Sequence, residues 1–358
     1  MKKNKNKKTN FLLYIVLILF ILVISLGFVF IKTSISPISD ISEEKTITIE
    51  NNWYGKDVLN YLEEENVIRN SDVAYYYAKF KGIALDFKAG TYNVDTSLSF
   101  VDLVSYLSNG NNAIQETVTI KFMEGSRVKD FAKEISDNTN LEYDEIIDNW
   151  NDEDFVRNLM SDYPFLSEEI FNEDVKYYLE GYLFPDTYEF YVNTSIEEVT
   201  RKILNKTLAI YNEYLDLINE SSYSVHELFS LASIVQRESG NKEDMKSIAG
   251  VFYNRLNDDM ALQSSVTVCY ALDIGLGEDW TKCEISQTNR DPYNTYQNTG
   301  LPPGPICCFG SDALEAVLDP EENDYYYFIG DVCGDGETIF AKTYAEQLAN
   351  QEEYLTCY

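Results

Sequence analysis

The chain has 358 residues with 28 basic and 60 acidic side chains and one histidine, so its formal net charge is −32. Such an acidic body repels polynucleotides, which excludes nucleic acid as a partner. The single histidine, His226, excludes zinc sites built on several histidines and argues against Ser-His-Asp or Cys-His catalysis. Hydrolytic chemistry here would depend on carboxylates, and we expect no metal and no cofactor.

The N-terminus reads as a membrane anchor. Residues 1–10 form a basic head with five lysines and no acid, and residues 11–31 are 21 residues without a charge, long enough to cross a bilayer as a helix. The lysines predict a cytoplasmic N-terminus with the remainder outside the cell membrane. A cleavable signal peptide is the alternative, but the stretch is too long and no A-x-A-like site follows. We predict a permanent single-pass transmembrane helix and a polar tether over residues 32–45.

The next part of the chain repeats a strand-then-helix pattern. The expected strands are Thr46–Ile49, Gly90–Val94 and Thr117–Ile120, and the expected helices are Gly55–Glu65, Phe100–Leu107 and Arg127–Ser136. This pattern predicts an α+β protein with a small α+β module at 46–112 and a larger mixed α+β domain at 113–358. In that domain we expect helices at 141–166, 196–219, 242–256 and 343–356, and paired strands at 325–329 and 338–341.

A central helix carries the strongest candidate for catalysis. Ser224 and Glu227 have capping-box spacing and predict its start. Helical periodicity places Leu228, Leu231 and Val235 on its apolar face, and His226, Ser230, Ser233 and Arg237 on its polar side. Glu238 lies in the last turn at the rim of the apolar face. Burial and the helix dipole both favour its protonated form there, as a general acid requires. The alternative is a helix-end glutamate turned into solvent.

Polar and aromatic groups gather in the loops of the last hundred residues. Tyr293, Asn294 and Tyr296 suit a carbohydrate, because a tyrosine ring stacks on a sugar face while an amide binds hydroxyl or acetamido groups. A rigid structural turn, stiffened by the prolines up to Pro305, is an equally good interpretation.

All six cysteines also lie in the last ninety residues: Cys269, Cys283, Cys307, Cys308, Cys333 and Cys357. Outside the cell, disulfides are permitted, and a Cys269–Cys283 bond would close a 15-residue loop. We favour at least two disulfides bracing the loops around 293–305. Free buried thiols are the alternative, and a zinc site is a weak one because no C-x-x-C pair is present.

Four motifs follow one another in a recognisable order. They are Phe87–Tyr92 (FKAGTY), Glu180–Tyr188 (EGYLFPDTY), Ala232–Glu238 (ASIVQRE) and Tyr293–Gly304 (YNTYQNTGLPPG). With the anchor ahead of them, they resemble the membrane-anchored endolytic murein transglycosylases of the YceG-like (MltG) family. The family's A-S-I-V-E-x-E has Gln236 at its first acid here. Residues 263–267 read QSSVT where relatives have Q-x-D-P-T, so an acid in that loop is missing.

The resemblance implies a LysM-like module at 46–112 and catalysis by Glu238. The glutamate would protonate the glycosidic oxygen between N-acetylmuramic acid and N-acetylglucosamine, then accept the proton of the muramoyl C6 hydroxyl as a 1,6-anhydro end forms. The expected substrate-binding residues are Gln263, Tyr293, Asn294, Tyr296, Glu180 and Asp186. Expected partners are peptidoglycan glycan strands, the membrane and cell-wall synthases. Alternatives are a non-catalytic peptidoglycan-binding scaffold and a hydrolytic muramidase that uses a second carboxylate such as Glu180 or Asp186.

Overall fold

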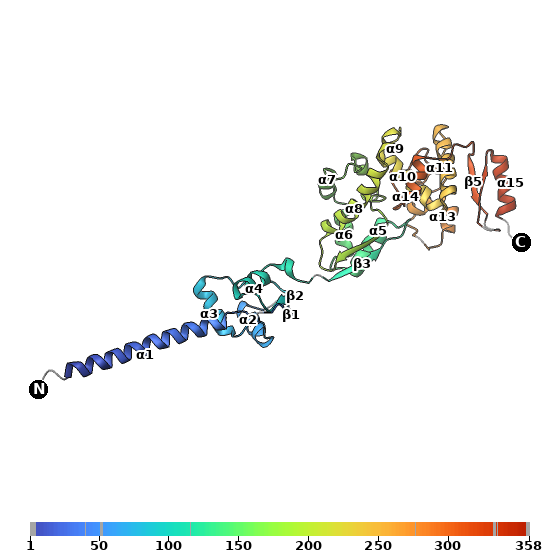
Figure 1. Ribbon diagram of the computed structural model, residues 1–358. Coiled ribbons are helices and arrows are strands. Elements are labelled where there is room, and N and C mark those ends of the chain that lie inside the picture. Colours follow the sequence, from blue (N-terminus) through green and yellow to red (C-terminus); the bar gives the residue numbers. More distant parts are fainter. Residues whose placement is uncertain are drawn as a thin grey trace. The chain divides into compact units, whose positions relative to one another are not determined.

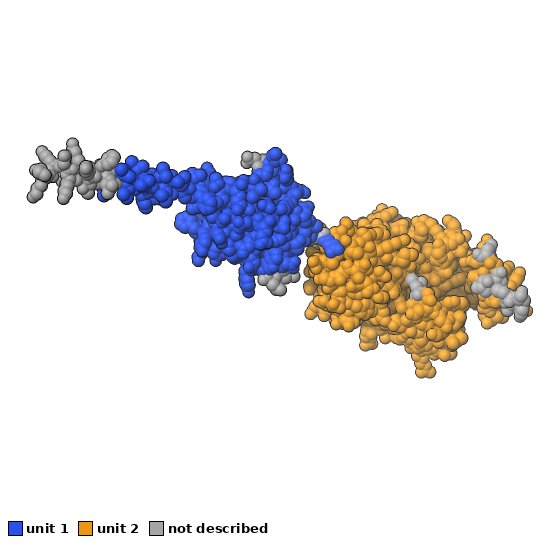
Figure 2. Space-filling model, turned by 90° about the horizontal axis from the view of Figure 1, so that it is seen from below, with its two compact units in different colours: residues 1–116 blue, residues 117–358 orange. Residues whose placement is uncertain are grey.

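The computed structural model describes residues 5–39, 41–50, 53–114, 116–275, 277–331, 334 and 336–355. They form two compact units, residues 1–116 and 117–358, and each is considered by itself (Figures 1 and 2). The fold is mixed α+β, as the alternating patterns predict, with three separate two-stranded antiparallel sheets among the described residues.

Helix α1, Lys5–Ser34, begins the first unit. Among the helices that the structure describes, it is the one long and apolar enough to cross a membrane, over Ile15–Ser34. Its apolar side chains from Ile15 to Ile31 are exposed, which in water would be unfavourable and in a bilayer is the required arrangement. The helix runs three residues past the predicted span, and strand β1 starts at Glu44, so the segment between them is shorter than the predicted tether.

The rest of the first unit packs helices around a two-stranded sheet. Strand β1, Glu44–Ile49, pairs antiparallel with β2, Gly90–Asp95, so that Ile47 lies opposite Tyr92. The helices are α2 (Gly55–Glu64), α3 (Ser71–Lys81), α4 (Phe100–Leu107) and the 3-10 turn η1 (Gly110–Asn112). Helix α3 was not predicted, because it buries only the small residues Ser71, Ala74 and Ala78 and leaves its tyrosines partly or largely exposed.

The second unit begins with a sheet whose strands are far apart in the chain. Strand β3, Thr117–Lys121, pairs antiparallel with β4, Thr187–Tyr191, so that Ile120 lies opposite Tyr188. Between and after them come α5 (Val128–Asn138), α6 (Tyr143–Trp150), α7 (Glu153–Met160), η2 (Glu168–Phe171), α8 (Ile196–Glu213) and α9 (Leu215–Glu220). The single helix predicted for 196–219 is interrupted at Tyr214, whose ψ of 9° leaves the helical region.

The centre of this unit is α10, Val225–Glu238, which packs against α11 (Lys242–Asn257), α12 (Ser265–Ala271) and α14 (Ser311–Leu318) (Figure 1). Ser224 accepts from the Glu227 amide and closes the predicted capping box. The predicted polar side is wrong, because neighbours cover the helix all round and bury His226, Ser230 and Ser233. The Ser230 hydroxyl donates to the His226 carbonyl, and the Ser233 hydroxyl accepts from the Ile306 amide, so both are satisfied without water.

The chain ends with the antiparallel strands β5 (Tyr327–Gly330) and β6 (Thr338–Ala341) and the helix α15 (Tyr344–Tyr354). These match the predicted strand pair and closing helix. The ring of Phe328 on β5 lies 5.8 Å from that of Phe252 on α11, edge to face, which fixes the hairpin on the helical body. The hairpin thereby becomes a wall beside the end of α10.

Candidate active site

A cleft of about 1200 Å³ opens where α10 ends. Its floor includes Glu238 and Arg255, one wall is formed by the short helix α13 (Thr281–Ile285) with Trp280 before it, and another by β5, β6 and α15. Gln263, Ser265 and Tyr296 also line it. A cleft of this volume lined by aromatic and amide groups suits sugar rings.

Glu238 is half-buried at this floor, and the Ser264 hydroxyl donates a 2.5 Å hydrogen bond to its Oε1. Burial raises the pKa of Glu238 to about 7, because a carboxylate loses hydration in the cleft. The Ser264 hydrogen bond and the charges of Arg237 and Arg255 oppose this rise, whereas the negative charge of Glu284 adds to it. Glu238 is therefore able to hold a proton near neutral pH and to donate it.

Arg255 organises the loop opposite Glu238. Its buried guanidinium donates to the carbonyls of Tyr326, Ala261 and Leu262, at 2.6, 3.0 and 2.8 Å. It also donates to Oε1 of Gln263 at 3.3 Å, and the Gln263 amide donates to the Thr295 carbonyl at 3.1 Å. Gln263 is thus held at φ +51°, an uncommon conformation for a residue other than glycine, with its side chain at the cleft.

The Tyr293–Tyr296 segment divides into buried and cleft-facing residues. Tyr296 lines the cleft, and burial raises its pKa far above the usual range. Asn294 is fully buried and its amide donates to the Gln287 and Asn289 carbonyls, while the buried Tyr293 ring packs 4.7 Å from that of Tyr270. The structure therefore brings Gln263 and Tyr296 together with Glu238, but gives Tyr293 and Asn294 the positions of residues that shape the loop.

Glu180 and Asp186 lie elsewhere. Glu180 is buried, accepts the Val128 amide at 2.9 Å at the start of α5, and lines a separate pocket. Asp186 pairs with Lys206 at 2.8 Å, which holds the pKa of its carboxyl below the usual range. Neither carboxylate lines the cleft with Glu238. Other carboxylates line the cleft, namely Asp244, Glu284 and Glu337, and of these Glu284 acts on the pKa of Glu238.

The sequence motifs converge at His226. Tyr182 of the Glu180–Tyr188 motif and Nδ1 of His226 share a 2.7 Å hydrogen bond, and Nε2 of His226 lies 2.8 Å from the Pro303 carbonyl. Gly181 has φ +78°, and a Cβ there would lie 2.2 Å from the Cβ of Pro305. The histidine is therefore a buried connector between two motifs and the central helix.

Gln236 occupies the position of the family's first acid in the Ala232–Glu238 motif. Its side chain accepts the Gly310 amide at 2.8 Å, just ahead of α14, and donates to Glu124 at 3.3 Å. A carboxylate would repel Glu124, so an amide is the better residue at this place. Gln236 serves packing between segments, away from the Ser264–Glu238 hydrogen bond.

Four residues of the cleft were not predicted from the sequence: Ser264, Arg255, Trp280 and Glu284. Ser264 and Arg255 act through side-chain contacts across the fold, which carry no local pattern. Trp280 offered a usable signal, because it is a lone aromatic residue in a polar stretch three residues before Cys283, and its side chain is 61% exposed on the cleft wall.

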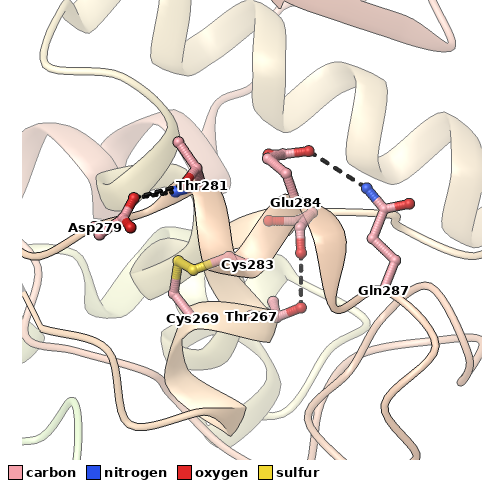
Figure 3. The surroundings of a disulfide bond; sticks show 8 residues. Thr267, Cys269, Asp279, Thr281, Cys283, Glu284 and Gln287 are labelled. Carbon is pink, nitrogen blue, oxygen red and sulfur yellow. Dashed lines mark hydrogen bonds between the residues drawn. A yellow bond between two sulfur atoms is a disulfide. The ribbon is translucent and has the colours of Figure 1, made fainter.

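Of the pairings that the sequence left open, Cys269–Cys283 is a disulfide in the structure, and it joins α12 to α13 (Figure 3). Figure 3 also shows Glu284 and Gln287 beside it, so the bond supports the α13 wall of the cleft. Cys307 and Cys308, which follow the loops at 293–305, are buried free thiols, so among the described residues the expected second disulfide bracing these loops is not present. Their sulfur atoms face different backbone carbonyls, of Ser233 and Met123. Cys333 and Cys357 lie outside the described residues.

Comparisons with known proteins agree with the motif order. The chain matches the profile of the YceG-like family over residues 47–353. It is 34% identical over 343 residues to a Bacillus subtilis (strain 168) protein named endolytic murein transglycosylase, covering 94% of this chain and 92% of the relative. A Streptococcus pneumoniae (strain D39) protein of the same name is 33% identical over 347 residues, and the match covers 92% of this chain and 62% of the relative.

Among solved structures, a crystal structure of a YceG-like protein from Listeria monocytogenes is similar, with a TM-score of 0.60 and 31% sequence identity. The match covers 86% of this chain and 99% of that one, so the similarity extends well beyond the cleft. The resemblance drawn from the four motifs is confirmed. The chain belongs to the YceG-like family.

Proposed function

We propose that this chain cleaves peptidoglycan glycan strands as an endolytic lytic transglycosylase, with Glu238 as the proton donor. The observation that carries the proposal is the position of Glu238, half-buried at the floor of a cleft of about 1200 Å³, with a pKa raised to about 7 by burial. The names of the relatives in B. subtilis and S. pneumoniae support the activity.

In the first half of the reaction, Glu238 transfers its proton to the oxygen between N-acetylmuramic acid and N-acetylglucosamine. The bond from that oxygen to C1 breaks, and positive charge develops on the muramoyl ring. The newly formed carboxylate, still bonded to Ser264, lies close to this charge and stabilises it. Gln263 and Tyr296 on the cleft walls would bind hydroxyl or acetamido groups and hold the ring in place.

In the second half, the muramoyl C6 oxygen forms a bond to C1 and its proton passes to the Glu238 carboxylate. A 1,6-anhydro end results, no water is consumed, and Glu238 is again protonated. One carboxyl group suffices because the substrate supplies its own nucleophile, whereas a glycoside hydrolase needs two.

A hydrolytic muramidase is the second candidate, because Glu284 is a further carboxylate on the cleft wall. Glu284 is exposed on α13 and would have to position a water molecule. A non-catalytic scaffold is the third candidate, and it offers no reason for a buried carboxyl group with a neutral pKa in the cleft.

We also propose that α1 is a single-pass anchor with a cytoplasmic head, that the catalytic unit is extracellular, and that residues 46–112 form a LysM-like module that holds glycan. An anchored enzyme works where new strands leave the membrane, so trimming or terminating nascent strands is the expected role, and cell-wall synthases are candidate partners. Protease added to protoplasts should digest the units after α1; their protection would overturn this topology.

The test uses the full-length chain in detergent, purified peptidoglycan and mass spectrometry of the products. Wild type should release fragments with 1,6-anhydromuramoyl ends, one water lighter than reducing ends. Glu238→Gln keeps the shape and loses the proton, so cleavage should fall at least about 100-fold. Glu284→Gln is the matched control and should still form anhydro ends. Reducing ends from wild type would show a hydrolase, and near-normal cleavage by Glu238→Gln would show that Glu238 is not the acid.

A further inference from the structure

A second pocket, of about 430 Å³, lies in the same unit and shares no lining residue with the cleft. It is lined by Arg127, Lys129, Asn151, Lys176, Tyr177, Glu180, Tyr270 and Asp273. Three of these side chains are cations, in a chain with a net charge of −32. A concentration of positive charge in so acidic a protein is the arrangement of an anion site.

Arg127 is the buried cation of the pocket. Its side chain is 10% exposed, and its Nε is buried with no hydrogen-bond partner among the described residues. A buried guanidinium N–H without a partner is costly, and a planar guanidinium matches carboxylate oxygens through two parallel hydrogen bonds. Arg127 therefore has capacity for one more acceptor.

A carboxylate of the protein itself already occupies part of this site. Asp273 Oδ1 lies 3.2 Å from Nη1 of Arg127, and Oδ2 lies 2.5 Å from Nζ of Lys129. The Asp273 side chain is 60% exposed, and its backbone has φ +62°. It belongs to the segment closed by the Cys269–Cys283 bond. An exposed side chain on a loop is easily displaced, so Asp273 behaves as an internal competitor for the site.

The rest of the pocket keeps its charge positive. Glu180 is buried, and burial raises its pKa to about 8, so it is largely neutral at pH 7. Lys176 lies 5.4 Å from the ring centre of Tyr270 and pairs with Asp291 at 3.0 Å. With Glu180 neutral, three cations face the two carboxylates of Asp273 and Asp291, and displacement of Asp273 leaves a clear positive excess.

Helix α12 connects the pocket to the cleft. At its start, Ser264 bonds Glu238 and Ser265 lines the cleft. At its end, Tyr270 lies 3.3 Å from Glu180, and the Ala271 carbonyl accepts from Lys176 at 3.0 Å. Seven helical residues span about 10 Å. An extended peptide covers roughly 3.3 Å per residue, so three or four peptide residues are as long as helix α12.

We propose that the Arg127–Lys129–Lys176 pocket binds a carboxylate of the peptide stem carried by a glycan strand in the cleft, displacing Asp273 from the two cations. This inference rests on the proposed function and extends it to recognition of the stem. A carboxylate is the favoured ligand because the Asp273 carboxylate shows that the group fits between Arg127 and Lys129.

The test measures binding of glycan strands to the full-length chain in detergent. All proteins carry Glu238→Gln, so that bound strands stay intact. Three strand preparations are compared: stems with free carboxylates, stems with amidated carboxylates, and strands without stems. Lys129→Gln removes one cation, Asp273→Asn removes the competitor while keeping a residue that tolerates φ > 0, and Lys133→Gln is the matched control on the same helix. Lys133 pairs with Asp137, is 67% exposed and lies outside the pocket.

For strands with free carboxylates, Lys129→Gln should weaken binding by about tenfold, the value of one charged hydrogen bond. Asp273→Asn should tighten it, and Lys133→Gln should leave it unchanged. Strands with amidated stems should bind the parent and its three variants with the same affinity, and the same should hold for strands without stems. The inference would be overturned if a substitution changed the affinity equally for all three preparations. It would also be overturned if Lys129→Gln and Asp273→Asn changed the affinity in the same direction. Cleavage of stem-free strands by the enzyme with Glu238 intact tests the proposed function separately.

Discussion

The Ser264 hydroxyl donates a 2.5 Å hydrogen bond to Oε1 of Glu238, across 26 residues of sequence. Ser264 is itself fixed, because its amide donates to the Thr295 hydroxyl at 3.1 Å. A donor to a carboxylate favours the charged form, so this contact opposes the effect of burial on the Glu238 pKa. The net result is a carboxyl group that is near half-protonated at neutral pH and held in one orientation.

The pH dependence of cleavage follows from this balance. If Glu238 is the proton donor, as proposed, it must be protonated in the free enzyme, so kcat/KM should be constant below its pKa of about 7 and should fall about tenfold per pH unit above it. Ser264→Ala removes the contact that favours the carboxylate, so the pKa should rise and the decline should begin at higher pH. The measurement is kcat/KM for glycan cleavage against pH, with Ser265→Ala, a neighbouring cleft serine, as the control. A decline shifted to lower pH would contradict the assigned hydrogen-bond role.

Glu284→Gln should shift the same profile in the opposite direction. The negative charge of Glu284 raises the pKa of Glu238, so its loss should lower that pKa and move the decline to lower pH. At acidic pH the variant should cleave at nearly the wild-type rate, since the anhydro mechanism needs one carboxyl group. A uniform loss of 100-fold or more at every pH would instead give Glu284 a direct role in proton transfer.

The helix that carries Glu238 shows what local sequence can predict and what it cannot. The Ser224–Glu227 capping box involves only neighbouring residues, and the helix starts where it predicts. The burial of Ser230 and Ser233 depends on segments far along the chain, such as the Ile306 amide that donates to Ser233. Helical periodicity assigns a polar face to serines, and it has no means of anticipating that a neighbouring segment supplies their hydrogen bonds.

The site shows the same division. The sequence predicts that Glu238 lies in the last turn of a helix, and it predicts that Gln263 and Tyr296 belong to the same site; the structure places all three at one cleft. The burial of Asn294 was not predicted, because a Tyr-Asn pair reads alike whether its amide faces a sugar or the Gln287 carbonyl. Ser264 and Glu284 change the pKa of Glu238. Both come from segments that follow the helix of Glu238 in the chain, and only the fold brings them close to it.

Removing the disulfide tests whether the α13 wall depends on it. Cys269→Ser with Cys283→Ser frees a 15-residue loop, which should lower the free energy of unfolding by about 3 kcal/mol. Because Trp280 lies in this loop and Glu284 directly follows it, KM for glycan should rise more than kcat falls. Thermal unfolding and cleavage kinetics measure the two effects, and wild type treated with reductant should behave as the double variant does. Equal unfolding temperatures with and without the bond would refute its stabilising role.

The free thiols give a separate check on the packing. Cys307 and Cys308 are buried, and burial raises both of their pKa values, so neither thiol should react with iodoacetamide in the folded chain. After unfolding without reductant, both should be alkylated while Cys269 and Cys283 remain protected. Peptide mapping by mass spectrometry distinguishes these sites. Fast labelling of Cys307 before unfolding would contradict its position against Ser233 in the core.

Glu180→Gln should change how stability depends on pH. The folded-state pKa of Glu180 is about 8 and its ordinary value is 4.5, so between these values the folded chain holds a proton that the unfolded chain has released. Stability contributed by this group therefore falls as pH rises through that window. The amide of the variant can still accept the Val128 N–H through its oxygen, so the fold should persist and the slope should flatten.

The comparison is best made with Glu238→Gln in both chains, because the raised pKa of Glu238 gives a slope of the same sign up to about pH 7. Chemical unfolding of the full-length chain in detergent at pH 5 and pH 8 then isolates Glu180. The free energy of unfolding of the Glu180→Gln variant minus that of its parent should be more positive at pH 8 than at pH 5. Asp186→Asn is the control: its carboxyl pKa is lowered by Lys206, so it is charged in both states across this range and its loss should cost the same at both pH values. A slope unchanged by Glu180→Gln would mean that Glu180 is ionised in the folded chain, with its charge balanced by Arg127.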